Sequence, residues 1–175
     1  RNALAKLVKQ NLYVTEECQS SLIPALAISQ NARPMVEHFI QQERGHDRLL
    51  KTALNSIVDT PDEVPLSPQT VTLMSLLRFC AERNFLAFAM AVDIFERSSY
   101  EKTDPLAQLL LKGGFSEAAK QINRHMDIND AGEHENMGLN FLFTMAPCNP
   151  NYALEALRLT ETLSLLMNKI SQSGA

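Results

Sequence analysis

The spacing of apolar residues is the feature of this chain that most restricts what it can fold into. Apolar side chains return every three or four residues along most of the 175 residues, and no segment keeps the period-two alternation of a β-strand. Leu, Ala, Met, Gln and Glu, which favour helices, dominate the sequence. We therefore expect an all-α fold, a multi-helix bundle that forms one domain over residues 1–175.

Prolines and glycines divide this pattern into six predicted helices. Their expected ranges are residues 2–29, 34–58, 68–97, 104–112, 116–143 and 152–172. Pro24 should kink or split the first helix, whereas three prolines between residues 59 and 68 exclude a helix from that loop. The third helix contains the apolar run 85–92, which should be buried on nearly all sides.

Composition and charge exclude several classes of protein. Hydrophobic residues make up 45% of the chain and charged residues 21%, and no apolar run reaches the ~18–20 residues of a membrane span. The net charge is −4 without a long basic stripe, so we expect neither nucleic acid nor a membrane as partner. Three scattered cysteines, Cys18, Cys80 and Cys148, indicate reduced thiols and a cytoplasmic location. The chain begins at Arg1 rather than Met, so we expect a domain truncated at its N-terminus.

A Glu-x-x-His pair in the second predicted helix is the first candidate metal site. Glu43 and His46 are three residues apart, so they share one helix face, as in carboxylate-bridged di-iron and di-manganese bundles. The alternative is a solvated face, since the neighbouring residues are polar. Glu37 lies nine residues before His46, half a turn away, and would join only if the helix broke near Gly45.

A denser polar cluster occupies residues 125–134 of the fifth predicted helix. Asp130 and His134 are four residues apart and share a face, which Asp127 extends by one turn. His125 is nine residues before His134, or roughly 180° round a regular helix. A π-bulge would bring it into line, so we expect a locally irregular backbone if His125 is a ligand. An exposed polar helix is the alternative.

Carboxylates also follow the apolar run of the third predicted helix. Asp93 and Glu96 must be exposed, paired or bound to a cation there, and the simpler interpretations are an ion pair from Asp93 to Arg97 and a helix-end charge at Glu96. Together the clusters suit two metal ions, and imidazole with carboxylate favours iron or manganese over zinc. The residues expected to converge, with Glu37 in reserve, are Glu43, His46, Glu96, His125, Asp130 and His134.

Residues 43–50 and 124–134 resemble the heme-oxygenase-like di-iron oxidases, a superfamily that includes CADD-like and TenA-like proteins. The resemblance implies a heme-oxygenase-like bundle. It also implies that Glu37 or Glu43 is the early carboxylate ligand and Glu96 the middle one. The interval from His125 to Asp130 is one residue wider than is usual in that family.

The resemblance further implies two Fe2+ ions, or manganese, with O2 as co-substrate. The substrate would be a small organic molecule such as an amino acid, an amine or a fatty-acid-like compound. Phe85 and Phe88 would line its pocket, with plain core packing as the alternative. A homodimer is the assembly that we expect. Two other functions remain open: a metal-free TenA-like hydrolase with a Cys nucleophile, and a non-enzymatic helical interaction protein.

Overall fold

The computed structural model describes residues 1–97 and 104–173, with side chains described to residue 170. Within these ranges the chain forms helices and no strand, which confirms the all-α class. The α-helices are α1 (Asn2–Leu22), α2 (Arg33–Gln42), α3 (His46–Asn55), α4 (Pro68–Arg83), α5 (Phe85–Glu96), α6 (Pro105–Lys112), α7 (Ser116–Ala131), α8 (Met137–Phe143) and α9 (Pro150–Ser173). None of the described helices is both long enough and apolar enough to cross a bilayer.

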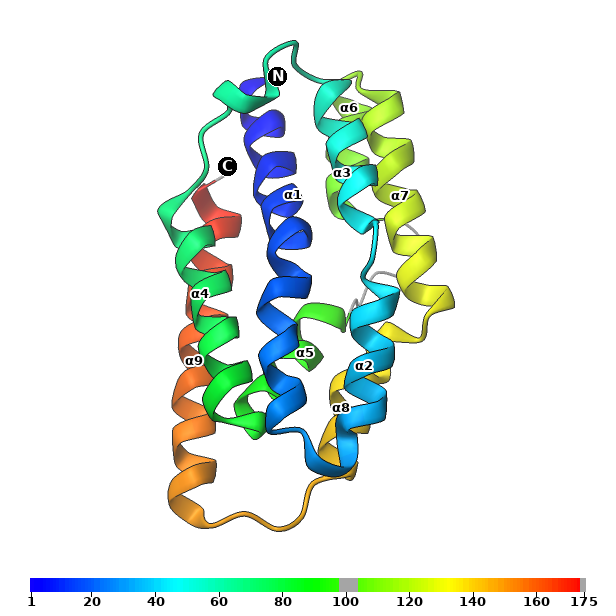
Figure 1. The fold of residues 1–175 in the computed structure, drawn as a ribbon. Helices are drawn as coiled ribbons and strands as arrows, with labels where there is room; N and C mark the ends of the chain where they lie inside the picture. The colour runs from blue at the N-terminus through cyan, green and yellow to red at the C-terminus, as the bar shows by residue number, and fades with distance from the viewer. Residues whose placement is uncertain (98–103, 174–175) are drawn as a thin grey trace.

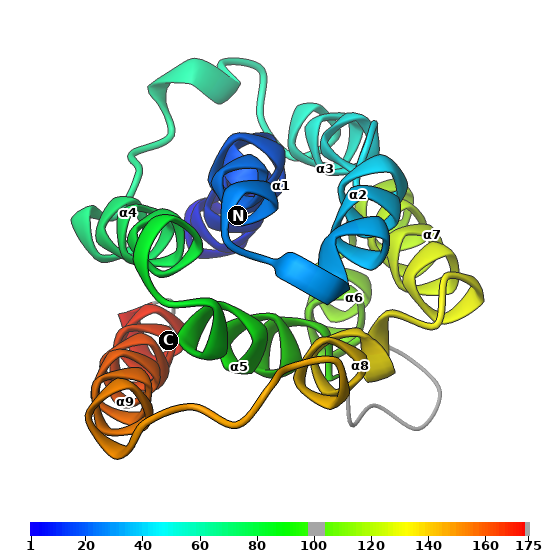
Figure 2. The same cartoon turned by 60° about the horizontal axis from the view of Figure 1, so that its bottom comes forward.

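The long helices run side by side as an elongated bundle (Figure 1). Viewed from its lower end (Figure 2), α1, α4, α9, α5, α8, α7 and α3 follow one another round the molecule. Helix α1 packs between α3 and α4, α3 packs on α7, α9 packs on α4 and α5, and α8 packs on α5. Helix α6 covers the upper part of α7.

Four of the predicted helices are interrupted, and each interruption has a local cause. α1 ends at Leu22 and passes into a 3-10 turn that holds Pro24, as expected from the proline. The second predicted helix breaks at Gly45, whose φ of 88° is left-handed. The third breaks at Asn84, which caps α5 by accepting a hydrogen bond from the Ala87 amide. The fifth breaks after α7, where Glu133 has a φ of 55°.

Two apolar clusters fill the bundle. One joins α1, α3, α6 and α7, around Val8, Leu54 and Leu110. The other joins α2, α4, α5, α8 and α9, around Phe39 and Phe141. Because α2 belongs to one cluster and α3 to the other, and likewise α8 and α7, both helix breaks lie where one core gives way to the other. The backbone interruptions therefore mark the level at which polar side chains enter the interior.

Candidate metal centre

Five of the predicted ligand residues meet at this level, and most come from helix ends. Glu43 directly follows α2, His46 begins α3, and Glu96 is the last residue of α5. His134 opens a short 3-10 turn, η4 (His134–Asn136), between α7 and α8. His125 alone comes from within a helix, α7. The interruptions of the bundle thus place the polar side chains.

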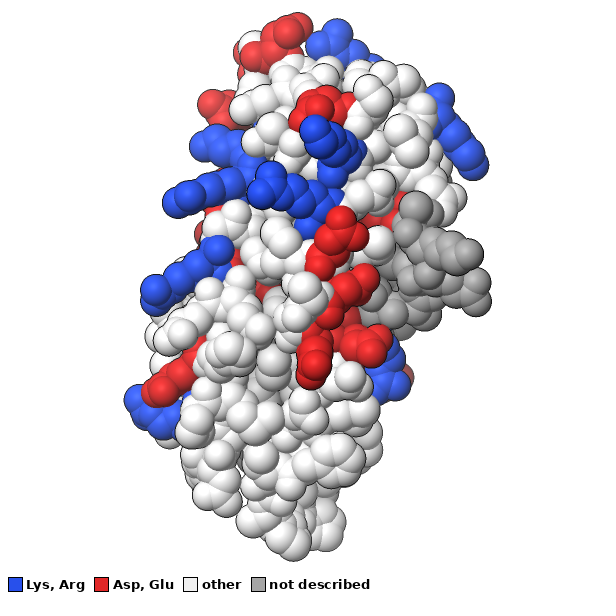
Figure 3. Space-filling view, turned by 90° about the vertical axis from the view of Figure 1, so that its right-hand side faces the viewer, with Lys and Arg blue, Asp and Glu red and all other residues white. Residues whose placement is uncertain are grey.

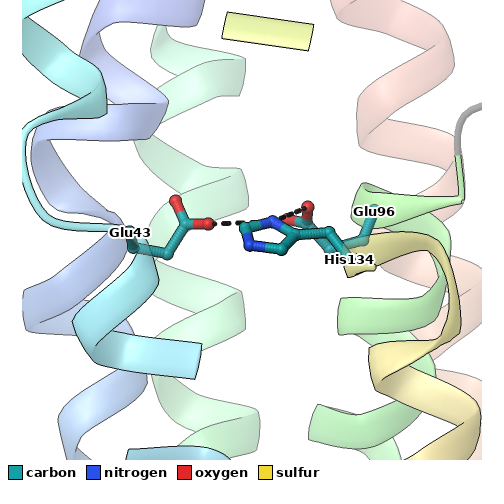
Figure 4. A group of neighbouring side chains, drawn as sticks. All are labelled: Glu43, Glu96 and His134. Atoms are coloured by element: carbon teal, nitrogen blue, oxygen red, sulfur yellow. Dashed lines mark hydrogen bonds and ion pairs between the residues drawn. The ribbon is translucent and has the colours of Figure 1, made fainter. Parts of the chain in front are cut away.

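Glu43, Glu96 and His134 form a compact group that we call the tripod (Figure 4). His134 Nδ1 lies within hydrogen-bond distance of Glu96 Oε2, at 3.0 Å, and 3.3 Å from Glu43 Oε1. One potential ligand atom from each residue lies within 4.8 Å of the others. His134 is 1% exposed and Glu43 6%, so the group is almost free of water. An ion could be held there by one imidazole and two carboxylates.

His46 and His125 form a second group beside the tripod, which we call the histidine pair. Their ring centroids are 5.0 Å apart and the rings are nearly perpendicular. Glu43 reaches both groups: its Oε2 lies 3.5 Å from His46 Nδ1, while its Oε1 faces His134. Each oxygen of this carboxylate therefore faces a different imidazole, and the rings of His46 and His134 stack with centroids 6.0 Å apart.

Several buried atoms of these side chains have no hydrogen-bond partner within the described residues. They are Glu43 Oε1, His46 Nδ1 and Nε2, His125 Nε2 and His134 Nε2. A buried polar atom left unpaired costs about 1–3 kcal/mol, so a cluster of them is normally satisfied by something. Carboxylate oxygens and imidazole nitrogens are donors that divalent metal ions accept. The residues present therefore fit a metal centre.

Electrostatics point the same way. Burial raises the pKa of the Glu96 carboxyl, which also stands at the negative end of α5. Burial opposes protonation of His134, yet its hydrogen bond to Glu96 and the charge of Glu43 raise its pKa above the ordinary value. Burial favours a neutral Glu43, but its contact with His46 and the nearby His134 and His125 lower its pKa. Burial lowers the pKa of His125 to about 4, which leaves a neutral imidazole free to bind a metal.

Close backbone contacts hold His134 in place. The Gln42 side-chain amide donates to the Gly132 carbonyl at 3.3 Å, which ties the two helix breaks together. A Cβ added to Gly132 would lie 2.7 Å from the His134 ring, so only glycine fits there. Gly138 likewise lets α8 approach the backbone of Asp93 on α5. These contacts bring η4 against the end of α5 and so bring His134 to Glu96.

The remaining predicted ligands stay outside the cluster. Glu37 is exposed and pairs with Arg33 at 2.9 Å, although the helix does break at Gly45. Asp130 is exposed at the edge of the adjoining cavity, so the expected convergence of six residues is reduced to five. Asp93 forms the ion pair with Arg97, at 2.8 Å, that was the simpler interpretation.

The expected distortion of the helix bearing His125 occurs, but elsewhere and in another form. α7 is a regular helix as far as Ala131, so no π-bulge brings His125 round. Instead the helix stops, and the turn through Gly132 and left-handed Glu133 swings His134 back to the side of His125. Ending the helix removes the phase conflict that a continuous helix would impose on the two histidines.

A cavity of about 550 Å3 adjoins the tripod. Glu43, Glu96, His125 and His134 line it, and so does Cys18, which the sequence did not single out. Burial raises the pKa of the Cys18 thiol well above its usual range, and the charges of Glu43 and Glu96 add to the effect. No sequence signal marked Cys18, because its partners lie far along the chain.

Phe85 and Phe88 do not line this cavity. Both are buried against Phe141, with ring centroids 6.1 and 6.0 Å from it, so they pack in the core rather than at the candidate substrate site. No protein-family model, curated protein or solved structure matches the chain.

Proposed function

We propose that this chain is a heme-oxygenase-like non-heme di-iron protein that activates O2 to oxidise a small organic substrate. The observation that carries the proposal is the position of Glu43, whose two oxygens face His134 on one side and His46 on the other. A carboxylate whose two oxygens face different imidazoles suits a dinuclear site. The unpaired buried atoms around it supply the further donors.

The donor set favours iron or manganese. The five residues offer only carboxylate oxygens and imidazole nitrogens, and Cys18 is outside the compact ligand group. Hard and borderline donors of this kind suit iron and manganese, while thiolate-rich sites suit zinc. Two ferrous ions bound there would supply the electrons and the open coordination positions that O2 activation requires.

The protein's own residues have three tasks in this function. Glu43 and Glu96 supply negative charge that would offset two divalent ions. His134 is oriented by the turn through Gly132, and His125 is kept neutral by burial. The apolar cluster around Phe39 and Phe141 closes the site from below and keeps water away. The cavity gives an organic substrate access to the same carboxylates.

The thiol state disfavours the metal-free hydrolase. A Cys nucleophile must ionise, and the groups that activate one are cations that lower its pKa. Cys18 instead faces two carboxylates, and its raised pKa keeps the thiol protonated. The cavity and the unpaired ligand atoms likewise have no use in a purely structural bundle.

The proposal is tested by loading the purified chain with Fe(II) under anaerobic conditions and counting iron by mass spectrometry. Two irons per chain, followed by O2 consumption on exposure to air, are expected. Glu96→Gln should lose iron, whereas Glu82→Gln, which removes an exposed carboxylate paired with Arg78, should not. A chain that binds no iron under these conditions, or an equal count in both variants, would contradict the proposal.

A further inference from the structure

The cavity beside the tripod runs along the first helix. Residues on one face of α1, from Leu7 through Val14 and Cys18 to Leu22, line it at helical intervals. Cys18 is level with the tripod, since it faces Glu43 and Glu96. Leu7 is eleven residues earlier, which is about 16 Å along a helix that rises 1.5 Å per residue. The cavity therefore has a metal end and a distant end.

The wall between these ends is mainly aliphatic. On α4 it is formed by Leu73, Met74 and Leu77, and on α9 by Met167 and Ile170. An extended chain of single bonds advances about 1.2 Å per bond, to judge from the span of an extended backbone, so 16 Å accommodates roughly thirteen bonds. A long unbranched apolar chain would fit the length and the lining of this space.

Apart from two histidines, the ionisable residues that line the cavity are mostly acidic. Glu43, Glu96, Asp104, Asp130 and Glu135 line the cavity, and no Lys or Arg of the described residues does. Asp130 and Glu135 are exposed beside His134, at the edge nearest the tripod. If Glu43 and Glu96 bind metal, these edge carboxylates remain free to attract a cation.

The outer surface on the α7 side is also acidic at mid-height. Figure 3 shows the side of the molecule that carries α7, where acidic side chains gather at mid-height and basic ones lie mainly above them. The segment from α7 to η4 contributes four exposed carboxylates: Asp127, Asp130, Glu133 and Glu135. A surface of negative potential around an opening raises the local concentration of cations and repels anions.

We infer that the cavity binds a long-chain aliphatic primary amine. The ammonium group lies at the edge formed by Asp130 and Glu135, and the chain extends along α1 toward Leu7. The inference rests on the proposed function, because it names the substrate class of the same site. A second observation ties the cavity to a ligand: Glu43, at its metal end, lines it, is 6% exposed, and its Oε1 has no hydrogen-bond partner among the described residues.

The head group is tested by titration calorimetry with dodecylamine, dodecanoate and dodecanol below their micelle concentrations, on the iron-free chain. Dodecylamine should bind at least about tenfold more tightly than dodecanoate, because the edge carboxylates repel an anion and no Lys or Arg of the described residues lines the cavity. The double variant Asp130→Asn, Glu135→Gln should remove most of this preference. The matched control Glu133→Gln, exposed but outside the lining, should keep it.

The chain position is tested with amines of different length. Each buried methylene adds about fourfold in affinity, so butylamine should bind far more weakly than dodecylamine. Leu73→Trp, inside the cavity, should shift the best chain to a shorter one, whereas Val71→Trp, on the exposed side of α4, should not. Circular dichroism of each variant checks folding.

Equal or tighter binding of dodecanoate, or no dependence on chain length, would overturn the inference. Iron is counted separately in the same preparations after loading with Fe(II). If the chain binds amine but takes up no iron, the di-iron proposal is wrong and the amine site is supported. If the chain takes up two irons but binds no amine, the di-iron proposal is supported and the amine inference is wrong.

Discussion

The tripod and the histidine pair are two halves of one polar layer, yet they are stabilised differently. In the tripod, His134 stands between two carboxylates that raise its pKa, so an imidazolium can hold Glu43 and Glu96 together without metal. In the histidine pair, both ring nitrogens of His46 and Nε2 of His125 lack a hydrogen-bond partner among the described residues. The tripod is therefore held by closer contacts between its own side chains than the histidine pair is.

This difference indicates what each half requires. The tripod has a metal-free state in which its charges compensate one another, so the fold tolerates its being empty. The histidine pair has one longer contact to a carboxylate, 3.5 Å from His46 Nδ1 to Glu43 Oε2, and Nε2 of both rings has no hydrogen-bond partner among the described residues. Glu43 belongs to both halves, which makes it the residue through which the loading of one affects the other.

Removing the shared carboxylate should have the largest effect. Glu43→Gln keeps the size of the side chain but deletes the charge that both halves use. We expect iron to fall from two per chain to less than about one. Losing a residue that is hydrogen-bonded to a metal ligand lowers metal affinity by about 10–100-fold, and losing a charged ligand itself should lower it more. Metal analysis after anaerobic loading and desalting measures it. Retention of two irons would show that Glu43 is not a ligand.

Removing one histidine of the pair should separate the halves. His46→Ala and His125→Ala should each lose one iron and keep the other in the tripod, because Glu43, Glu96 and His134 remain. The same analysis gives the count, and thermal unfolding with and without iron gives the stability gained on binding. Loss of both irons, or of neither, would show that the two halves are not separate subsites.

Crowding the turn that carries His134 should weaken the tripod selectively. A methyl group on Gly132 would lie 2.7 Å from the His134 ring, so Gly132→Ala must displace it. We expect metal affinity in the tripod to fall by about 10–100-fold, as when an outer-shell partner is lost. Gly45→Ala is the comparison, because its left-handed φ costs roughly 1–2 kcal/mol of stability but its methyl group meets nothing within 4 Å. Equal metal affinities in these two variants would contradict the role of the turn.

Acid should empty the tripod before the histidine pair. The raised pKa of His134 stabilises the metal-free fold below the ordinary value of about 6.5, and that contribution is lost as the pH rises through the raised value. A metal ion and a proton compete for His134. The metal affinity of the tripod should therefore fall as the pH drops through the raised pKa of His134. His125, with a pKa of about 4, stays neutral over this range. Manganese titrations of His125→Ala and His134→Ala between about pH 8 and pH 5 compare the halves, and matching pH profiles would argue against this difference.

The smallest effect is expected at Glu37. Its side chain is exposed and pairs only with Arg33, so Glu37→Gln should leave two irons per chain and change stability by less than about 0.5 kcal/mol. His38→Ala, next to it and also exposed, should behave alike. Iron counts and chemical unfolding check both variants. A lost iron in Glu37→Gln would mean that the early carboxylate ligand had been misassigned.

The all-α fold could be predicted because it depends on local spacing. Apolar periodicity, Pro24 and the proline-rich loop are read within a few residues, and the structure agrees at each. The breaks at Asn84 and Glu133 were not predicted. Asn84 is buried and bonded to the backbone of Tyr152, and the turn at Glu133 is held by the Gln42 side chain on the Gly132 carbonyl, so both breaks depend on tertiary contacts.

The same limit explains the outcome for the ligands. Glu43 and His46 could be paired from their spacing, which the turn at Gly45 leaves short enough for contact. Asp130 was expected with His134 because helical phase was extended past Ala131, where α7 ends. Glu37 was expected to join only through a break near Gly45, and it stays on the surface with Arg33 although that break occurs. Sequence alone could place His125 and His134 together only through a π-bulge, whereas the structure does it with a turn. The phase of a helix is predictable, but its termination by distant contacts is not.

Anomalous diffraction at the iron edge, from crystals grown anaerobically with Fe(II), tests the central claim most directly. We expect two peaks on either side of Glu43, one next to Glu96 and His134 and one next to His46 and His125. A single peak at the tripod, peaks at Asp130 or Glu37, or no peak in iron-loaded crystals would contradict a di-iron centre in this bundle.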